Sequence, residues 1–287
     1  QVYAPSFIDY VEGIYVGYKY YETAAAEGVI DYDATVQYPF GYGLSYTTFS
    51  QKMSDLKDDG TSLSFDVTVT NTGSVAGKDV VEVYYNPPYI NGGIEKASAN
   101  LIAFEKTDLL EPGASETIAI TFDKEEMASY DMSDSGCYVL EQGDYILSIN
   151  SDSHTILDSR TYTQNADIRY DVANKRDSDS VVAVNQFGDA AGDITYLSRA
   201  DHFANYTAAT AAPADTNMAE KYVEGYHLNA NYDYTTDMNP EDEMPTTGAK
   251  NGIRLAELRG ADYDDPRWDS LLDELTVDEM VEMTAMC

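Results

Sequence analysis

The sequence predicts a mainly β protein, in which an antiparallel β-sandwich is flanked by irregular segments and followed by a C-terminal helical pair. Three observations indicate this fold class. Short runs between residues 63 and 149 alternate apolar and polar residues, turn residues separate these runs, and an apolar pattern of helical spacing begins near Asp265. Alternation with a period of two is typical of half-buried strands, and several short strands separated by turns indicate a sandwich.

The first predicted strand of the sandwich is the clearest. Leu63, Phe65, Val67 and Val69 alternate with polar residues, and the turn sequence Asn71-Thr72-Gly73 follows them. Further strands are expected at 80–85, 101–104, 117–122 and 145–149. Their boundaries are the turn signals Asn86-Pro87-Pro88, Glu111-Pro112-Gly113 and Gln142-Gly143.

The last part of the chain predicts two helices. Asp265 is placed to cap the first helix, with Pro266 at its first position. Its apolar face is formed by Trp268, Leu271, Leu272 and Leu275. The sequence Thr276-Val277-Asp278-Glu279 predicts a capping box for the second helix. Because the sequence stops at Cys287 within this apolar pattern, we expect the helix to belong to a longer chain.

An aromatic run at residues 38–49, YPFGYGLSYTTF, predicts a tight corner between two folds. Pro39 fixes its own φ, and Gly41 and Gly43 permit close backbone approaches. Upstream, residues 14–18 alternate as in a strand, and the Ala-rich residues 22–27 predict one helical turn or a loop. We expect residues 1–49 to be the end of a preceding fold.

Residues 166–261 predict an extended connecting segment. Residues 194–201 have the pattern of a strand that enters a turn, residues 204–219 predict a loop, and residues 232–248 are acidic with no sustained period. A connection of this length is unusual inside one compact domain. We therefore expect it to wrap over neighbouring domains and to be partly disordered without them.

Charge and composition argue against several classes of partner. The 51 acidic and 17 basic residues give a net charge of −34, and binding to nucleic acid or to an anionic membrane surface needs clustered Lys and Arg. No stretch reaches the apolar length of a membrane helix. The cysteines, Cys137 and Cys287, have no metal-ligand spacing and predict no disulfide framework. The 25 tyrosines fit half-buried strands, with a sugar-stacking surface as the alternative.

Several motifs resemble glycoside hydrolase family 3, whose members are mostly β-glucosidases and β-xylosidases. Residues 12–21, EGIYVGYKYY, and 39–49, PFGYGLSYTTF, resemble the end of the family's α/β-sandwich domain. VTVTNTGSVAGKDVVEVYY at 67–85 and LLEPGASETIAITF at 109–122 resemble the fibronectin type III-like module that usually follows it.

The order of the remaining motifs resembles one subgroup of that family. RWDSLLDELTVDEMVEMTAMC at 267–287 is similar to the helices that open the family's (β/α)8 barrel, but here it follows the sandwich. Together with LSRAD at 197–201 and TTGAKNG at 246–252, this order matches the subgroup with reversed domain order. The implied domains are a C-terminal remnant of an α/β-sandwich (1–49), a fibronectin type III-like β-sandwich (50–165), an extended connecting segment (166–261) and the opening helices of a truncated barrel (262–287).

The resemblance implies a retaining β-glycosidase that hydrolyses terminal non-reducing β-linked sugars with an Asp nucleophile and a Glu acid/base. In the family these two carboxylates lie outside the motifs quoted above. We therefore assign no catalytic residue, and we expect no cofactor and no metal. The expected partners are an oligosaccharide or β-glucoside substrate, through the intact enzyme, and the α/β-sandwich and barrel domains on which this chain packs. No nucleic acid or membrane partner is expected.

Few other residues are candidates for a site. Glu12 lies in the EGIYVGY motif, where it is placed either to approach a substrate pocket or to make a structural hydrogen bond. His154, His202 and His227 are scattered, and no G-x-S-x-G elbow indicates a triad.

Two acidic stretches and one sequon complete the candidates. Residues 177–179 and 262–265 resemble fragments of calcium loops, but they lack the glycine and the final Glu of such a loop. Asn205-Tyr206-Thr207 is a glycosylation sequon that has meaning only in a secretory setting.

Two functions are consistent with these patterns. The first is a section of a β-glycosidase that supplies the fibronectin-like module and the inter-domain connections and is inactive alone. The alternative is a non-catalytic β-sandwich that binds carbohydrate or another protein, since a fold does not fix a function. The acidity of the chain is compatible with the bacterial cytoplasm and with the exterior.

Overall fold

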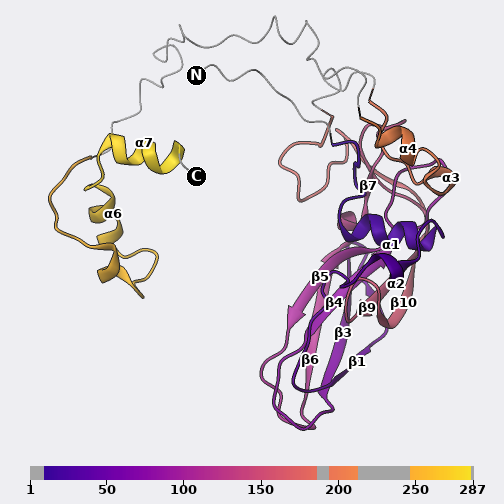
Figure 1. Cartoon of the computed structure of the whole chain (residues 1–287), viewed down its shortest axis with the longest axis horizontal. Helices are drawn as coiled ribbons and strands as arrows, with labels where there is room; N and C mark the ends of the chain where they lie inside the picture. The colour runs from indigo at the N-terminus through magenta and orange to yellow at the C-terminus, as the bar shows by residue number, and fades with distance from the viewer. Residues whose placement is uncertain (1–9, 186–193, 213–245, 286–287) are drawn as a thin grey trace, which may run out of the picture. The chain divides into compact units, whose positions relative to one another are not determined.

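The computed structural model describes residues 10–185, 194–212 and 246–285 (Figure 1). The chain divides into two compact units, Gln1–Met218 and Ala219–Cys287. The sandwich and the short helices beside it lie in the first unit. Its helices are α1 (Tyr18–Ala26), α2 (Tyr32–Thr35), the 3-10 helix η1 (Lys124–Met127), α3 (Ala200–Phe203) and α4 (Tyr206–Ala209). Its strands are β1 (Phe49–Met53), β2 (Lys57–Asp58), β3 (Ser62–Asn71), β4 (Val80–Asn86), β5 (Asn100–Lys106), β6 (Ser115–Asp123), β7 (Ser129–Tyr130), β8 (Tyr138–Leu140), β9 (Gly143–Asn150), β10 (Ile156–Gln164) and β11 (Ile168–Tyr170).

Two antiparallel sheets form the sandwich. In one sheet, β3 pairs with β6 on one side and with β1 and β2 on the other. In the second sheet the strand order is β10-β9-β4-β5. A small third sheet has the order β11-β8-β7. The mainly β fold class and the antiparallel sandwich are therefore confirmed.

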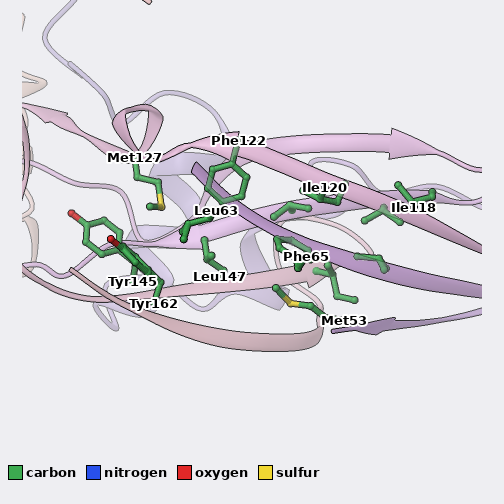
Figure 2. Packing of buried hydrophobic residues seen from close by; sticks show 14 of the residues in the cluster. Met53, Leu63, Phe65, Ile118, Ile120, Phe122, Met127, Tyr145, Leu147 and Tyr162 are labelled. Atoms are coloured by element: carbon green, nitrogen blue, oxygen red, sulfur yellow. The ribbon is translucent and has the colours of Figure 1, made fainter. Parts of the chain in front are cut away.

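The core lies between the two larger sheets. Leu63, Phe65, Val67 and Val69 of β3 are all at most 1% exposed, and Leu147 of β9 is fully buried opposite them. Figure 2 shows Leu63, Phe65 and Leu147 pointing toward one another between the strands. Burial of one such side chain contributes about 1.5–3 kcal/mol, so the alternating face of β3 is a main source of stability.

The predicted strands at 63–70, 80–85, 101–104, 117–122 and 145–149 are confirmed within β3, β4, β5, β6 and β9. The turn after β3 is confirmed as well. The buried Asn71 side chain donates 2.8 Å hydrogen bonds to the carbonyls of Val75 and Leu110 and accepts one from the Thr47 hydroxyl. Asn71 therefore ties the turn after β3 to two other loops of the sandwich.

The predicted strand at residues 14–18 is wrong. Residues 11–14 form a turn, and α1 begins at Tyr18 after Gly17, whose φ of 59° is left-handed. A left-handed glycine ends an extended strand, and the alanines at 24–26 favour a helix. Residues 22–27 were expected to form one helical turn or a loop; residues 22–26 complete this nine-residue helix, and Glu27 is its C-cap.

Two further expectations between 194 and 219 are also corrected. The predicted strand at 194–201 forms no ladder, and α3 begins at Ala200. The predicted loop at 204–219 contains the helical turn α4, whereas residues 213–219 lie outside the described ranges. Figure 1 shows α3 and α4 beside α1 at one end of the sandwich.

The second unit contains the 3-10 helix η3 (Leu255–Leu258), α6 (Arg267–Leu272) and α7 (Val277–Ala285). The helical pair is confirmed. The capping box is also confirmed, since Glu279 N donates to Thr276 Oγ1 at 3.2 Å and Thr276 N donates to Glu279 Oε2 at 2.8 Å. The first helix begins at Arg267, one residue later than predicted, and the Asp265 carboxylate accepts from the Arg267 N–H at 3.0 Å.

Candidate functional site

An open pocket of about 360 Å³ lies beside α1 and α2. Five aromatic rings line it, from Tyr18, Tyr21, Tyr32, Tyr38 and Phe40. The Tyr18 and Phe40 rings stack at 4.6 Å between centroids. Ligand pockets in proteins commonly have this volume and this aromatic lining.

The aromatic run that continues from this pocket lies on the surface. Tyr42 is 46% exposed, Leu44 is 88% exposed and Tyr46 is 98% exposed. The run turns tightly, because Tyr42 N donates to the Pro39 carbonyl at 3.1 Å. It therefore presents large apolar groups outward from a fixed backbone, which is a surface suited to contact with another body.

A buried carboxylate, Glu22 of α1, anchors the wall of the pocket. Glu22 accepts hydrogen bonds from the Tyr32 hydroxyl at 2.6 Å and the Ser153 hydroxyl at 2.7 Å, and its second oxygen lies 2.8 Å from His154 Nδ1. Ser153 N also donates to the Phe40 carbonyl at 2.8 Å. This cluster fastens α1, α2 and the aromatic run to the turn between β9 and β10. Ser153 and His154 both bind Glu22, so they form no nucleophile–base pair.

A second carboxylate, Glu82 of β4, lies under the aromatic corner. Gly41 has a φ of 85°, and a Cβ added there would lie 2.3 Å from Glu82 Oε2. Burial raises the pKa of the Glu82 carboxyl, and the hydrogen bond from the Tyr84 hydroxyl, at 2.8 Å, partly opposes this rise. Gly41 is therefore needed both for its left-handed backbone and for its close approach to Glu82.

The candidates from sequence are not brought together. Glu12 is exposed in the turn before α1. His154 binds Glu22, His202 Nδ1 lies 2.7 Å from Glu27 Oε2, and His227 lies outside the described residues. Glu22 was not predicted from the sequence. The one sequence signal for Glu22 is a lone carboxylate within an Ala-rich helical stretch. The partners of Glu22 follow 10 residues later (Tyr32) and more than 130 residues later (Ser153 and His154).

The two acidic stretches hold no ion-binding geometry. Asp179 pairs with Arg176 at 2.9 Å, and Asp265 pairs with Arg267. Within the ranges that the structure describes, no group of three or more acidic, His or Cys side chains is placed to hold a metal.

A pocket of about 740 Å³ in the second unit is lined by Tyr263 and Trp268 together with acidic residues, among them Asp264, Asp265 and Asp269. The hydrogen bond from Arg267 lowers the pKa of Asp265 to about 2. Asp265 is thus fully ionised at neutral pH and is unsuited to act as a general acid.

The Asn205 side chain of the sequon has a structural role. The Asn205 amide donates to the Tyr196 carbonyl at 2.8 Å, and its oxygen accepts from Ser198 N at 3.1 Å. A glycan would be attached to the same Nδ2 atom that makes the first of these bonds. Cys137 is a buried free thiol. No helix among the described residues has the length and apolarity required to cross a membrane.

Comparison with known proteins finds one domain match and several relatives that match part of this chain. A family model for the fibronectin type III-like domain matches residues 79–153. Over 162 residues the chain is 40% identical to β-glucosidase A of Butyrivibrio fibrisolvens, covering 48% of this chain and 18% of that protein. It is 38% identical over 161 residues to a β-glucosidase of Ruminococcus albus, covering 54% of this chain and 16% of the relative. The chain thus spans less than a fifth of the length of these two curated relatives.

Solved structures give similar matches. β-Glucosidase 3B of Thermotoga neapolitana, in complex with α-D-glucose, is 37% identical with a TM-score of 0.47, over 55% of this chain and 20% of that one. The family 3 β-glucosidase of Bifidobacterium adolescentis is 28% identical with a TM-score of 0.49, over 65% of this chain and 25% of that one. The domain match and the curated relatives therefore show a fibronectin type III-like domain within a section of the chain that is similar to β-glucosidases.

Proposed function

We propose that this chain is the joining section of a retaining β-glycosidase that hydrolyses terminal β-linked glucosides, and that it is catalytically inactive alone. In this proposal the sandwich holds the neighbouring α/β-sandwich and barrel domains in position. Residues 1–49 belong to the former and residues 262–287 to the latter. The support for the proposal is the 40% identity to a β-glucosidase over about half of this chain.

The observation that carries the joining role is the exposed aromatic run. Leu44 and Tyr46 are almost fully exposed on a fixed backbone, next to a pocket walled by rings. Contiguous apolar surface of this kind is uncommon on isolated soluble proteins and marks a contact surface. In the proposal, this surface is covered by the neighbouring domains of the enzyme.

Catalysis by this chain alone is not expected. A retaining glycosidase needs two carboxyl groups about 5–5.5 Å apart, one of which must hold a proton near neutral pH. No carboxylate is among the residues that line the aromatic pocket, and in the other pocket Asp265 has its pKa lowered.

An activity assay with aryl β-glucosides tests this part of the proposal. We expect no turnover from the purified chain, with a trace of an authentic β-glucosidase added in parallel as the detection control. Turnover that stays with the chain through a further purification step would contradict it.

A chimera tests the joining role. The matched section of the Butyrivibrio fibrisolvens β-glucosidase is replaced by the corresponding residues of this chain, and we expect an active enzyme. A combined Leu44→Ser and Tyr46→Ser change should then lower the thermal midpoint of the chimera by several degrees, while the same change leaves the isolated chain unaltered. Equal effects in the two proteins would show that the run is not a contact surface.

The second candidate function is carbohydrate binding without catalysis, which the five rings of the aromatic pocket favour. Sugars stack their apolar faces on aromatic rings, and the charge of −34 fits a neutral ligand. Calorimetric titration with cello-oligosaccharides tests this alternative. Binding that is lost in Tyr38→Ala but kept in Tyr46→Ala, whose ring is outside the pocket, would favour it over the joining role.

A further inference from the structure

Residues 195–209, which we call the strap, are bound to α1 and to the loop between β4 and β5. Leu197, Phe203 and Ala209 are at most 5% exposed and form a cluster with Tyr15, Ala24 and Ala97. The Phe203 ring meets the Tyr15 ring edge-on, with 5.0 Å between centroids. This small core is separate from the core of the sandwich.

Polar contacts fix the strap at Arg199. Its Nε lies 2.6 Å from Glu27 Oε1, its NH1 donates to the Lys96 carbonyl at 3.0 Å, and its guanidinium lies 4.2 Å from the centroid of the Tyr89 ring. Arg199 is thus held by a carboxylate, a carbonyl and an aromatic face at once. A largely covered guanidinium with all three kinds of partner indicates specific recognition of this residue.

Glu95 is the second fixed point. Its carboxylate accepts hydrogen bonds from the Tyr15 hydroxyl at 2.5 Å, from Arg199 N at 3.0 Å and from the Ser198 hydroxyl. One side chain therefore joins the strap to the segment that leads into α1. Loss of Glu95 would leave three donors without their acceptor.

Three residues of α3 that are not glycine have a left-handed backbone, so this segment of the strap is a left-handed turn rather than a regular right-handed helix. The φ angles of Asp201, His202 and Phe203 are 51°, 60° and 57°. Side chains other than glycine disfavour this conformation. Here the contacts of the turn impose it, because Asp201 and Asn91 exchange hydrogen bonds of 2.8 and 2.7 Å, His202 pairs with Glu27, and Phe203 is buried.

A locally unfavourable backbone conformation persists only where the surrounding contacts determine it, as the contacts with Asn91 and Glu27 do here. We propose that α1 and the residue 89–97 loop form a recognition surface for a peptide of the pattern Leu-Ser-Arg-x-Asp-x-Phe, and that this chain fills it with its own strap. Because this surface holds the strap as far as Ala209, it sets where the next part of the chain starts. This inference goes beyond the joining role and does not depend on any catalytic activity.

Hydrogen exchange of the full chain, followed residue by residue, tests the proposal. In the unaltered chain the amides of Leu197, Arg199 and Asp201 should be protected, since each donates to a distant acceptor. Glu95→Ala should raise their exchange rates by at least about tenfold and leave the amides of β3 and β9 unchanged. Strap amides that are unprotected in the unaltered chain, or an equal acceleration in β3 and β9, would overturn the proposal.

Two variants of one residue test the left-handed turn. His202→Gly should keep the strap protected, because glycine adopts this conformation without cost. His202→Val should release the strap, because a β-branched side chain disfavours the conformation most. Both variants lose the contact with Glu27, so equal exchange in the two would show that the turn geometry has no role.

Recognition is tested by adding a peptide. In the Phe203→Ala chain, an excess of a synthetic peptide with the sequence of residues 195–209 should restore protection to the α1 amides, and the same peptide with Arg199→Ala should not. Restoration by both peptides, or by neither, would overturn specific recognition. None of these measurements involves glycoside hydrolysis, so failure of the strap proposal and failure of the proposed function are distinguishable.

Discussion

The ring of Tyr32 lies flat against the imidazole of His154, with 3.7 Å between the ring centroids and 4° between the planes. Both groups also bind the same carboxylate, Glu22. Residues from α1, α2 and the β9–β10 turn therefore meet in one polar cluster around the buried Glu22, although more than 130 residues separate Glu22 from His154. The residues before the sandwich are thus part of the same packed body as the sandwich.

Glu22→Ala should destabilise the first unit. The change leaves the hydroxyls of Tyr32 and Ser153 without their acceptor, and each unsatisfied buried group costs about 1–3 kcal/mol. We expect a loss of about 2–4 kcal/mol in the free energy of unfolding, measured by urea denaturation. Glu12→Ala is the control on an exposed turn, with an expected change within about 0.5 kcal/mol. Similar losses for both variants would show that the cluster contributes no stability.

Gly41→Ala should lower the free energy of unfolding, whereas Gly43→Ala should change it little. A Cβ at Gly41 meets the Glu82 carboxylate on a left-handed backbone, whereas a Cβ at Gly43 has no neighbour within 4 Å. We expect a loss of about 1–3 kcal/mol for Gly41→Ala and a much smaller one for Gly43→Ala. In a Glu82→Ala background the cost of Gly41→Ala should shrink. An unchanged cost there would assign the effect to backbone conformation alone.

Phe65→Ala and Phe104→Ala separate buried from exposed aromatic rings of the sandwich. Phe65 is 1% exposed in the core, whereas Phe104 on β5 is 70% exposed. Truncation of a buried Phe costs about 3–5 kcal/mol, so we expect Phe65→Ala to unfold at a much lower urea concentration. Phe104→Ala should unfold close to the unaltered chain, and a large loss there would contradict the exposure of β5.

Asp131→Asn should weaken the protein at neutral pH but not in strong acid. Burial alone would raise the pKa of the Asp131 carboxyl, but hydrogen bonds from the backbone of Ser135 and from the Ser133 and Ser135 side chains hold it well below its usual range. A depressed pKa adds stability that is present above the ordinary carboxyl pKa and is lost as the pH falls through the folded value.

The measurement is the difference in unfolding free energy between Asp131→Asn and the unaltered chain, taken across the acidic range. We expect about 1–3 kcal/mol at pH 7, decreasing as the pH falls below the usual carboxyl range. A difference that is constant with pH would show that the carboxylate charge is not what the hydrogen bonds stabilise.

Glu82→Gln should raise the stability of the protein at neutral pH, whereas Asp131→Asn should lower it. Burial raises the pKa of Glu82, so its ionised form opposes folding. The unaltered chain has its full Glu82 stability below the ordinary carboxyl pKa and loses it as the pH rises through the raised folded value. We therefore expect Glu82→Gln to gain stability relative to the unaltered chain as the pH rises from mildly acidic to neutral. Thermal melting of both proteins across this pH range measures the gain. A gain that is equal at all pH values would contradict this origin.

The strands with a two-residue period, such as the one containing Leu63 and Phe65, were predictable because one face of each is buried. β10 was missed because its residues are mostly polar and its burial is confined to Tyr162 and Gln164 at one end. Tyr18, the first residue of α1, was included in a predicted strand because residues 14–18 alternate, and a glycine at position 17 does not by itself show that its backbone is left-handed.

The polar clusters around Glu22 and Glu95 could not be predicted from the sequence. Glu22 and Glu95 are two of 51 acidic residues, and only the fold shows which distant hydroxyls and amides they bind. The family resemblance indicated the LSRAD motif but not its contacts. The left-handed turn at Asp201 follows from those contacts rather than from local preference.

The pocket of the second unit contains Trp268, whose Nε1 donates to the Asp262 carbonyl at 2.9 Å, and this is the single tryptophan of the chain. Fluorescence excited at the red edge of absorption, where tyrosine is silent, therefore reports on the second unit alone. The sheets, and with them the β contribution to far-ultraviolet circular dichroism, lie in the first unit. One sample carries two separate optical reporters, so independent melting of the two units can be observed without any label.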